Sequence, residues 1–178
     1  MQQSVMREMI TNTGESLYDL SLRQSVLLVF LRHFGCIFCK EALIDISKKR
    51  KSFEIKCVNI VLVHMATEEV AEDYFKSFNL NGVTHVSDPE CVFYQKFGLV
   101  KANSSQLMGL KNWVRGFEIS IGKGIEVSMR NIGDAFQMPG VFVLKEGQIE
   151  ESFIHKSPAD RPDYEKLISC CIMNNQVS

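Results

Sequence analysis

The sequence has no apolar run of about eighteen residues, the length that a membrane-spanning helix needs. Its first residues include Arg7 and Glu8, and the apolar core of a secretion signal does not follow them. The formal net charge is only -1, whereas a protein that binds a phosphate backbone normally carries a basic surplus. We therefore expect a cytoplasmic protein without nucleic-acid or membrane partners.

The sequence also lacks a second pair of metal ligands. Cys36 and Cys39 form a Cys-x-x-Cys pair, and a structural zinc site would need a further Cys or His pair. The other four cysteines are Cys57, Cys91, Cys170 and Cys171, and the four histidines are scattered. The spacing thus favours redox chemistry over a metal site, and we expect no metal. Cys57 is predicted to be a small buried residue inside a strand over 55–63.

The 178 residues are enough for a single domain, with 46% hydrophobic and 23% charged residues as in ordinary globular proteins. Apolar segments typical of strands alternate with helical patterns, which predicts an α/β fold with a mainly parallel sheet covered on both faces. Asp88-Pro89 is typical of a helix start. Residues 102–137 show no clear period and are predicted to be an insertion that partly covers the site.

The most informative segment places the dithiol after a strand. Residues 26–31 are apolar without polar alternation, as in a strand buried on both faces, and helical spacing follows from Phe38. Cys36 and Cys39 therefore fall in or just before the first helical turn, beside unpaired N–H groups and the positive end of the helix dipole. That environment favours a thiolate. A thiolate at Cys36 that attacks a substrate is released when Cys39 attacks in turn.

The end of the sequence predicts an antiparallel hairpin, with strands over 141–144 and 149–154, and then an amphipathic helix from Tyr164. This order, with the Cys-x-x-Cys helix before it and Met138-Pro139-Gly140 at its entry, resembles a thioredoxin fold over nearly the whole chain. The resemblance implies a central mixed sheet flanked by helices on both faces. It also implies a cis proline at Pro139, before the hairpin and against the dithiol.

Within that fold the sequence is most similar to the peroxiredoxin-like branch of the AhpC/TSA antioxidant superfamily. The matching segments are 30–41, 87–98, 113–115 and 139–144. The resemblance implies an antioxidant thiol oxidoreductase with Cys36 and Cys39 as the working pair and no metal or organic cofactor. Typical members carry a threonine three residues before the peroxidatic cysteine, and here Cys36 occupies that position before Cys39.

These observations leave three hypotheses for function. In the first, Cys36 attacks a disulfide, Cys39 resolves the adduct, and Met138 and Pro139 shape the substrate groove. In the second, one of the two cysteines is peroxidatic, and Arg32 or Arg115 polarises the peroxide.

The third hypothesis is a catalytically weak redox-sensing or protein-binding module, with residues 107–113 as its surface. For the two enzymatic versions we expect a reducing thiol system as electron donor and a disulfide or peroxide as substrate. A homodimer is compatible with either.

Overall fold

The apolar run after Gln24 forms β1 (Ser25–Phe30), the central strand of a five-stranded sheet in this computed structural model. The structure describes residues 2–102, 133–157 and 160–173. The sheet order is β3-β2-β1-β4-β5, where the other strands are β2 (Val58–His64), β3 (Thr84–Ser87), β4 (Gly140–Lys145) and β5 (Gln148–Ile154). The β1, β2 and β3 strands are parallel, and β4 and β5 are antiparallel to their neighbours. The predicted mixed sheet and hairpin are confirmed.

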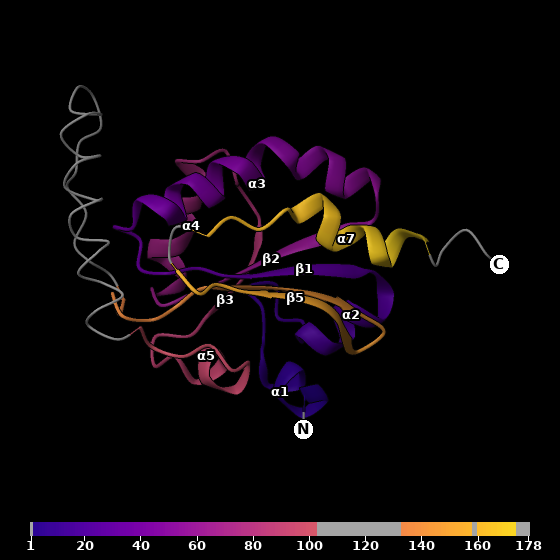
Figure 1. Ribbon diagram of the computed structural model, residues 1–178, viewed down its shortest axis with the longest axis horizontal. Helices are drawn as coiled ribbons and strands as arrows, with labels where there is room; N and C mark the ends of the chain where they lie inside the picture. The colour runs from indigo at the N-terminus through magenta and orange to yellow at the C-terminus, as the bar shows by residue number, and fades with distance from the viewer. Residues whose placement is uncertain (1, 103–132, 158–159, 174–178) are drawn as a thin grey trace.

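In the described part of the chain, six helices cover both faces of this sheet (Figure 1). One face carries α3 (Ile37–Ile55), α4 (Glu68–Lys76) and α7 (Tyr164–Met173), and the other carries α1 (Gln2–Glu8), α2 (Leu17–Arg23) and α5 (Val92–Lys96). Side chains of β1 alternate between the two cores: Leu27 and Val29 pack under α3, while Val26 and Leu28 pack against α1 and α2. Because β1 is covered on both sides, its residues 26–30 are all apolar.

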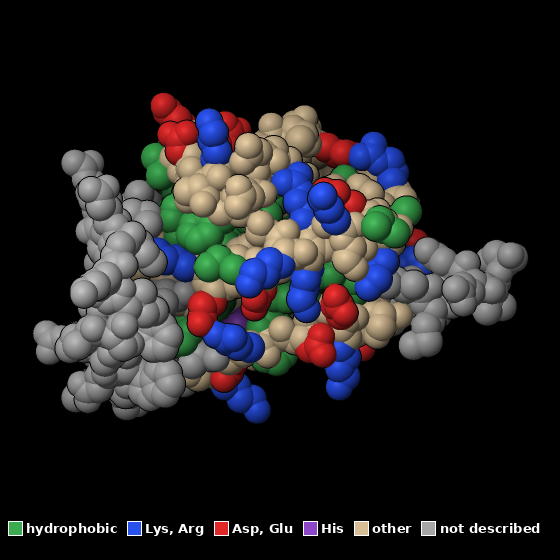
Figure 2. Space-filling view, turned by 90° about the horizontal axis from the view of Figure 1, so that it is seen from above, with side chains coloured by type: hydrophobic (Ala, Val, Ile, Leu, Met, Phe, Trp, Pro, Cys, Tyr) green, Lys and Arg blue, Asp and Glu red, His purple; other side chains and the backbone are tan. Residues whose placement is uncertain are grey.

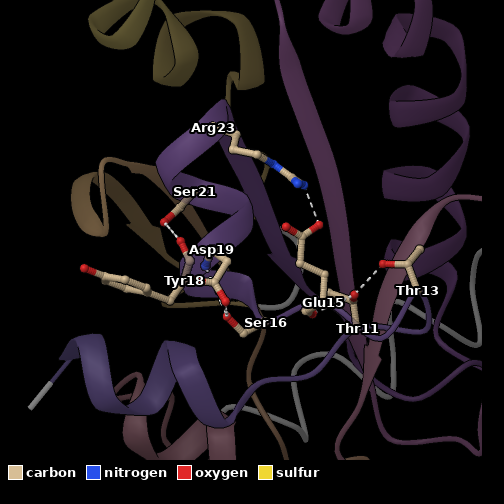
Figure 3. Close-up of polar contacts among 8 residues, drawn as sticks. All are labelled: Thr11, Thr13, Glu15, Ser16, Tyr18, Asp19, Ser21 and Arg23. Carbon is tan, nitrogen blue, oxygen red and sulfur yellow. Dashed lines mark hydrogen bonds and ion pairs between the residues drawn. The ribbon is translucent and has the colours of Figure 1, made fainter.

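Figure 3 shows polar contacts within the N-terminal layer, and further contacts join this layer to the sheet. Ser16 caps α2 by accepting a hydrogen bond from the backbone N–H of Asp19. Ser21 accepts the N–H of Gly147 in the β4–β5 turn, and its backbone oxygen accepts that of Glu146. Gly147 has a φ of +73°, and a Cβ there would lie 2.5 Å from the Tyr18 ring, so glycine is required on both counts. The two short helices of this layer were not predicted from the sequence.

The predicted strand over 55–63 is wrong at its start, because α3 continues to Ile55 and β2 begins only at Val58. Cys57 lies in the connecting turn with a φ of +55° and is exposed. The prediction that it is buried is therefore also wrong. The tight turn between helix and strand forces this residue to the surface.

The predicted helix start at Asp88-Pro89 is displaced, since α5 begins at Val92. Asp88 nevertheless supports the helix, because its carboxylate accepts the backbone N–H groups of Val92, Phe93 and Tyr94 at 2.9, 2.8 and 3.2 Å. Only 4% of Asp88 is exposed, so water cannot replace these bonds if the carboxylate is removed.

We expect Asp88→Ala to lower the free energy of unfolding by about 1–3 kcal/mol, the cost of losing a cap and leaving buried donors unpaired. Urea denaturation measures this loss. Asp88→Asn retains one acceptor oxygen and should lose less. Equal stability of the alanine variant and the unaltered protein would show that the carboxylate does not hold α5.

The predicted insertion over 102–137 lies almost wholly outside the described residues, but both of its ends are placed. Lys101 and Gln137 form an antiparallel bridge, and the N–H of Ala102 donates to the oxygen of Phe136 at 2.7 Å. The segment therefore leaves and re-enters the fold at one point. Among the described helices none is long and apolar enough to cross a membrane. On the face formed by α3 and α7, acidic and basic side chains are interspersed (Figure 2).

Candidate active site

The dithiol lies where the sequence predicts it, between the end of β1 and the start of α3. Cys36 is the N-cap of α3, and its backbone oxygen accepts the N–H groups of Cys39 and Lys40 at 3.1 and 3.2 Å. Both cysteines are free thiols, with exposed fractions of 5% and 4%. The N-cap position places Cys36 at the unpaired N–H end of the helix. The pair is thus built into the first helical turn and largely shielded from water.

Arg32 contacts both sulfur atoms. Its guanidinium Nη1 donates to Cys36 Sγ at 3.3 Å, while its backbone N–H donates to Cys39 Sγ at 3.0 Å. The side chain is held in place by two backbone carbonyls, those of Gln137 (3.2 Å from Nε) and Ala135. Arg32 is 3% exposed, so a permanent cation is buried beside the dithiol.

The thiols of Cys36 and Cys39 have very different pKa values. A hydrogen bond from Cys39 and the charge of Arg32, with help from the backbone amides of Cys39 and Phe38, lower the pKa of Cys36 to about 6, although burial opposes this. Burial raises the pKa of Cys39 well above its ordinary value, and the hydrogen bond and negative charge of Cys36 raise it further. At neutral pH Cys36 is the thiolate and Cys39 the thiol that stabilises it.

The loop between β1 and α3 rests on aromatic side chains. The Tyr74 hydroxyl donates to the backbone oxygen of Phe34 at 2.7 Å, and the two rings stack with centroids 4.1 Å apart. The hydroxyl of Tyr94 donates to the backbone oxygen of Leu31, at the start of the same loop, at 2.6 Å. These bonds fix the backbone just before Cys36. The sequence alone does not indicate that Tyr74 or Tyr94 belongs to the site.

His33 does not supply positive charge to the dithiol. Burial, followed by the charge of Arg32, lowers the pKa of His33 to about 4, so its ring is neutral at neutral pH. The backbone oxygen of His33 does accept the N–H of Cys36 at 3.0 Å. Of His33 and Arg32, the two basic residues in this loop, Arg32 is therefore the charged one.

A small cavity opens beside Cys39 rather than beside Cys36. Its volume is about 50 Å³, room for a few water molecules. The walls come from β1, α3, the entry to β4 and the loop before α7, and they include Arg32, Cys39, Asp45, Pro139, His155 and Tyr164. Pro139 thus lies close to the dithiol as predicted. His155 was not predicted as a site residue, because a single histidine after a strand gives no sequence signal.

The predicted cis bond at Pro139 is wrong. Over the described residues every peptide bond is trans. The N–H of Met138 donates to the oxygen of Val100 at 3.2 Å, and Gly140 already pairs with Phe30 in the sheet. The backbone on both sides of Pro139 is therefore paired, and a proline directly before a strand is tolerated there.

Two predicted site residues remain, Met138 and Arg115, and the structure describes only the first of them. Met138 is buried, with 3% of its surface exposed, directly before Pro139. Arg115 and the predicted partner surface at residues 107–113 lie outside the described residues. No group of three or more metal-ligating side chains occurs in the part of the chain that is described.

Comparisons with known proteins bear on the family and the fold of this chain. Residues 45–158 match the family model for AhpC/TSA antioxidant enzyme. Prostamide/prostaglandin F synthase of Danio rerio is 30% identical over 164 residues, which are 88% of this chain and 80% of that protein.

Two solved structures resemble the fold. A peroxiredoxin 6 of Arenicola marina gives a TM-score of 0.61 at 13% identity, covering 95% of this chain and 69% of that one. A putative thiol:disulfide interchange protein DsbE from Chlorobium tepidum gives 0.58 at 17% identity, covering 92% and 91%. At such identities the likeness concerns the thioredoxin-like fold alone.

Proposed function

Because this chain belongs to the AhpC/TSA antioxidant enzyme family and is a thiol-dependent oxidoreductase, we propose that it works through a Cys36–Cys39 dithiol cycle. In this cycle Cys36 is the attacking thiolate and Cys39 resolves the adduct. The observation that carries the proposal is the unequal pair: a pKa of about 6 at the N-cap sulfur and a buried thiol hydrogen-bonded to it. A dithiol needs this asymmetry to attack with one sulfur and resolve with the other.

The proposed roles of the neighbours follow from their contacts. Arg32 stabilises the Cys36 thiolate through its guanidinium, as a charge-assisted hydrogen bond does. Pro139 forms a wall of the cavity at Cys39, and Met138 supports it from the interior. Arg115 remains a predicted second cation for the substrate. A reducing thiol system returns the disulfide to the dithiol, no organic cofactor is needed, and a cytoplasmic location and a homodimer remain predictions.

We expect Cys39→Ser to trap a covalent adduct on Cys36 when the reduced protein is mixed with a small aromatic disulfide. Without Cys39, the mixed disulfide has no internal thiol to release it. Peptide mass spectrometry identifies the modified residue. Cys36→Ser is the matched control and should give no adduct at Cys39. An adduct found only on Cys39 would reverse the two roles, and turnover that persists in both variants would refute the cycle.

Peroxide reduction is a second candidate for the oxidative half of the same cycle. Cys36 is only 5% exposed, which admits a peroxide more readily than a protein disulfide. The reaction would oxidise the Cys36 thiolate to sulfenic acid, and Cys39 would then displace hydroxide to close the disulfide. Stopped-flow mixing with hydrogen peroxide tests it, since a rate equal to that of a free thiol would exclude it. Lipid substrates belong in the same assay, because one relative is named for prostamide and prostaglandin F synthesis.

A further inference from the structure

The second step of the cycle needs a thiolate at Cys39, and the reduced protein opposes its formation. Three effects raise the pKa of Cys39: burial, the hydrogen bond with Cys36 and the negative charge of Cys36. Once Cys36 is bonded to a substrate sulfur, its charge and its role as acceptor disappear. Burial then remains as the one opposing effect, while the N–H and charge of Arg32 favour the thiolate. The proton of Cys39 still needs an acceptor.

His155 is placed to be that acceptor. Its ring lines the same small cavity as Cys39, and its Nδ1 is buried without a hydrogen-bond partner. The backbone groups of Pro139 and Asp160 favour the protonated ring, and the neutral ring has one N–H and one nitrogen with a lone pair. Packing alone does not explain why a ring that lines a water-sized cavity has a buried nitrogen without a hydrogen-bond partner.

Burial keeps His155 neutral. Burial lowers its pKa below the ordinary value, and Arg32 lowers it further, while the negative charge of Asp160 acts in the opposite direction. At neutral pH the imidazole therefore carries a free lone pair, as a base must. The titratable or charged side chains that share the cavity walls with it come from the segment between β1 and α3, from α3, from the loop before α7 and from α7; they are Arg32, Cys39, Glu41, Asp45, Asp160, Arg161 and Tyr164.

We propose that His155 accepts the proton of Cys39 through cavity water during resolution. The step rests on the dithiol cycle proposed above, with a disulfide RS–SR as oxidant. Cys36 has already formed a Cys36–S–SR bond and released one RS⁻. The proton leaves Cys39 for His155, and the Cys39 thiolate attacks Cys36 Sγ. The Cys36–SR bond breaks, the Cys36–Cys39 bond forms, and the departing RS⁻ takes a proton from the imidazolium or from solvent.

The test separates the two steps with 5,5′-dithiobis(2-nitrobenzoate), whose coloured thiolate is released once on attack and once on resolution. All variants carry serine at the four cysteines outside the dithiol. We expect His155→Gln to leave the first release unchanged and to slow the second by about tenfold to a hundredfold at neutral pH. The unchanged first release also shows that the loop and helix are intact.

The pH profile distinguishes proton transfer from a structural role. With His155 the second release should be nearly independent of pH above the pKa of the imidazole. In His155→Gln it should rise with pH, because hydroxide replaces the base. Imidazole in the buffer should partly restore the rate of the variant. A glutamine that merely loosened the wall would change neither the slope nor the response to imidazole.

Two control variants test whether the slower second release is specific to His155. His33→Gln removes the other half-buried histidine near the dithiol, which does not line the cavity, and should leave both releases unchanged. Asp45→Asn removes a carboxylate of the cavity wall and should also leave the second release unchanged. A second release with the same rate and pH profile in His155→Gln overturns the proposal, as does slowing by Asp45→Asn alone. Absence of any second release in the unaltered dithiol would instead refute the cycle itself.

Discussion

Cys36→Ser is expected to reduce turnover of a disulfide substrate to the rate measured without protein, a loss on the order of a thousandfold or more. The reason is that the hydroxyl of serine does not ionise near neutral pH, even at the N-cap of α3 and beside Arg32. Cys39 cannot replace the lost thiolate, because burial raises its pKa well above the ordinary value. Coupled oxidation of the reducing system measures the loss.

The contrary result would be informative. Substantial turnover in Cys36→Ser would mean that Cys39, which lines the cavity, is the sulfur that meets the substrate. Cys57→Ser provides the matched control, because Cys57 is an exposed cysteine in the turn after α3, away from the dithiol. Its replacement should leave turnover unchanged.

Arg32→Met should raise the pKa of Cys36 by about one to two units, the usual effect of removing an opposite charge in contact with a thiolate. The sign of the effect on rate then depends on pH. At pH values below 6, fewer variant molecules carry the thiolate, and alkylation of Cys36 becomes several-fold slower. Above pH 9 both proteins are fully ionised, and the more basic thiolate of the variant reacts faster. The two pH profiles should therefore cross.

Alkylation with iodoacetamide, followed by fragmentation of the peptide in the mass spectrometer to separate Cys36 from Cys39, measures these profiles. Arg32→Lys retains the positive charge but not the three-way hydrogen bonding of the guanidinium, so it should keep most of the lowered pKa. Identical profiles for Arg32→Met and the unaltered protein would assign the low pKa of Cys36 to the hydrogen bond from Cys39 alone.

The parts of the fold that the sequence predicts correctly are those in which one physical requirement dominates. Residues 26–31 are apolar because β1 is covered on both faces, and the change to helical spacing after Gly35 locates the dithiol at the start of α3. The family resemblance adds that the sheet is mixed and covered by helices on both faces, which periodicity cannot supply. The structure and the comparisons confirm the fold and the family, while the site roles stay predictions.

The wrong predictions concern features that depend on contacts distant in sequence. The end of α3 and the exposure of Cys57 are set by where β2 joins the sheet, and the intervening residues carry no Gly or Pro that marks the turn. The trans bond at Pro139 depends on the path from Val100 and Gln137 into β4. His155 enters the site because β5 and the loop before α7 bring it to Cys39, which no motif indicates.

The position of Arg32 has a consequence for the equilibrium between the dithiol and the disulfide. In the reduced protein a buried cation faces a thiolate. When the two sulfurs bond to each other, that anion vanishes, and the guanidinium keeps its hydrogen bonds to the backbone oxygens of Gln137 and Ala135. Oxidation therefore removes the anion in contact with a buried positive charge, which penalises the disulfide form. The standard reduction potential of the Cys36–Cys39 disulfide should therefore be higher than that of an equivalent pair without the arginine. The disulfide form is then the stronger oxidant of the two.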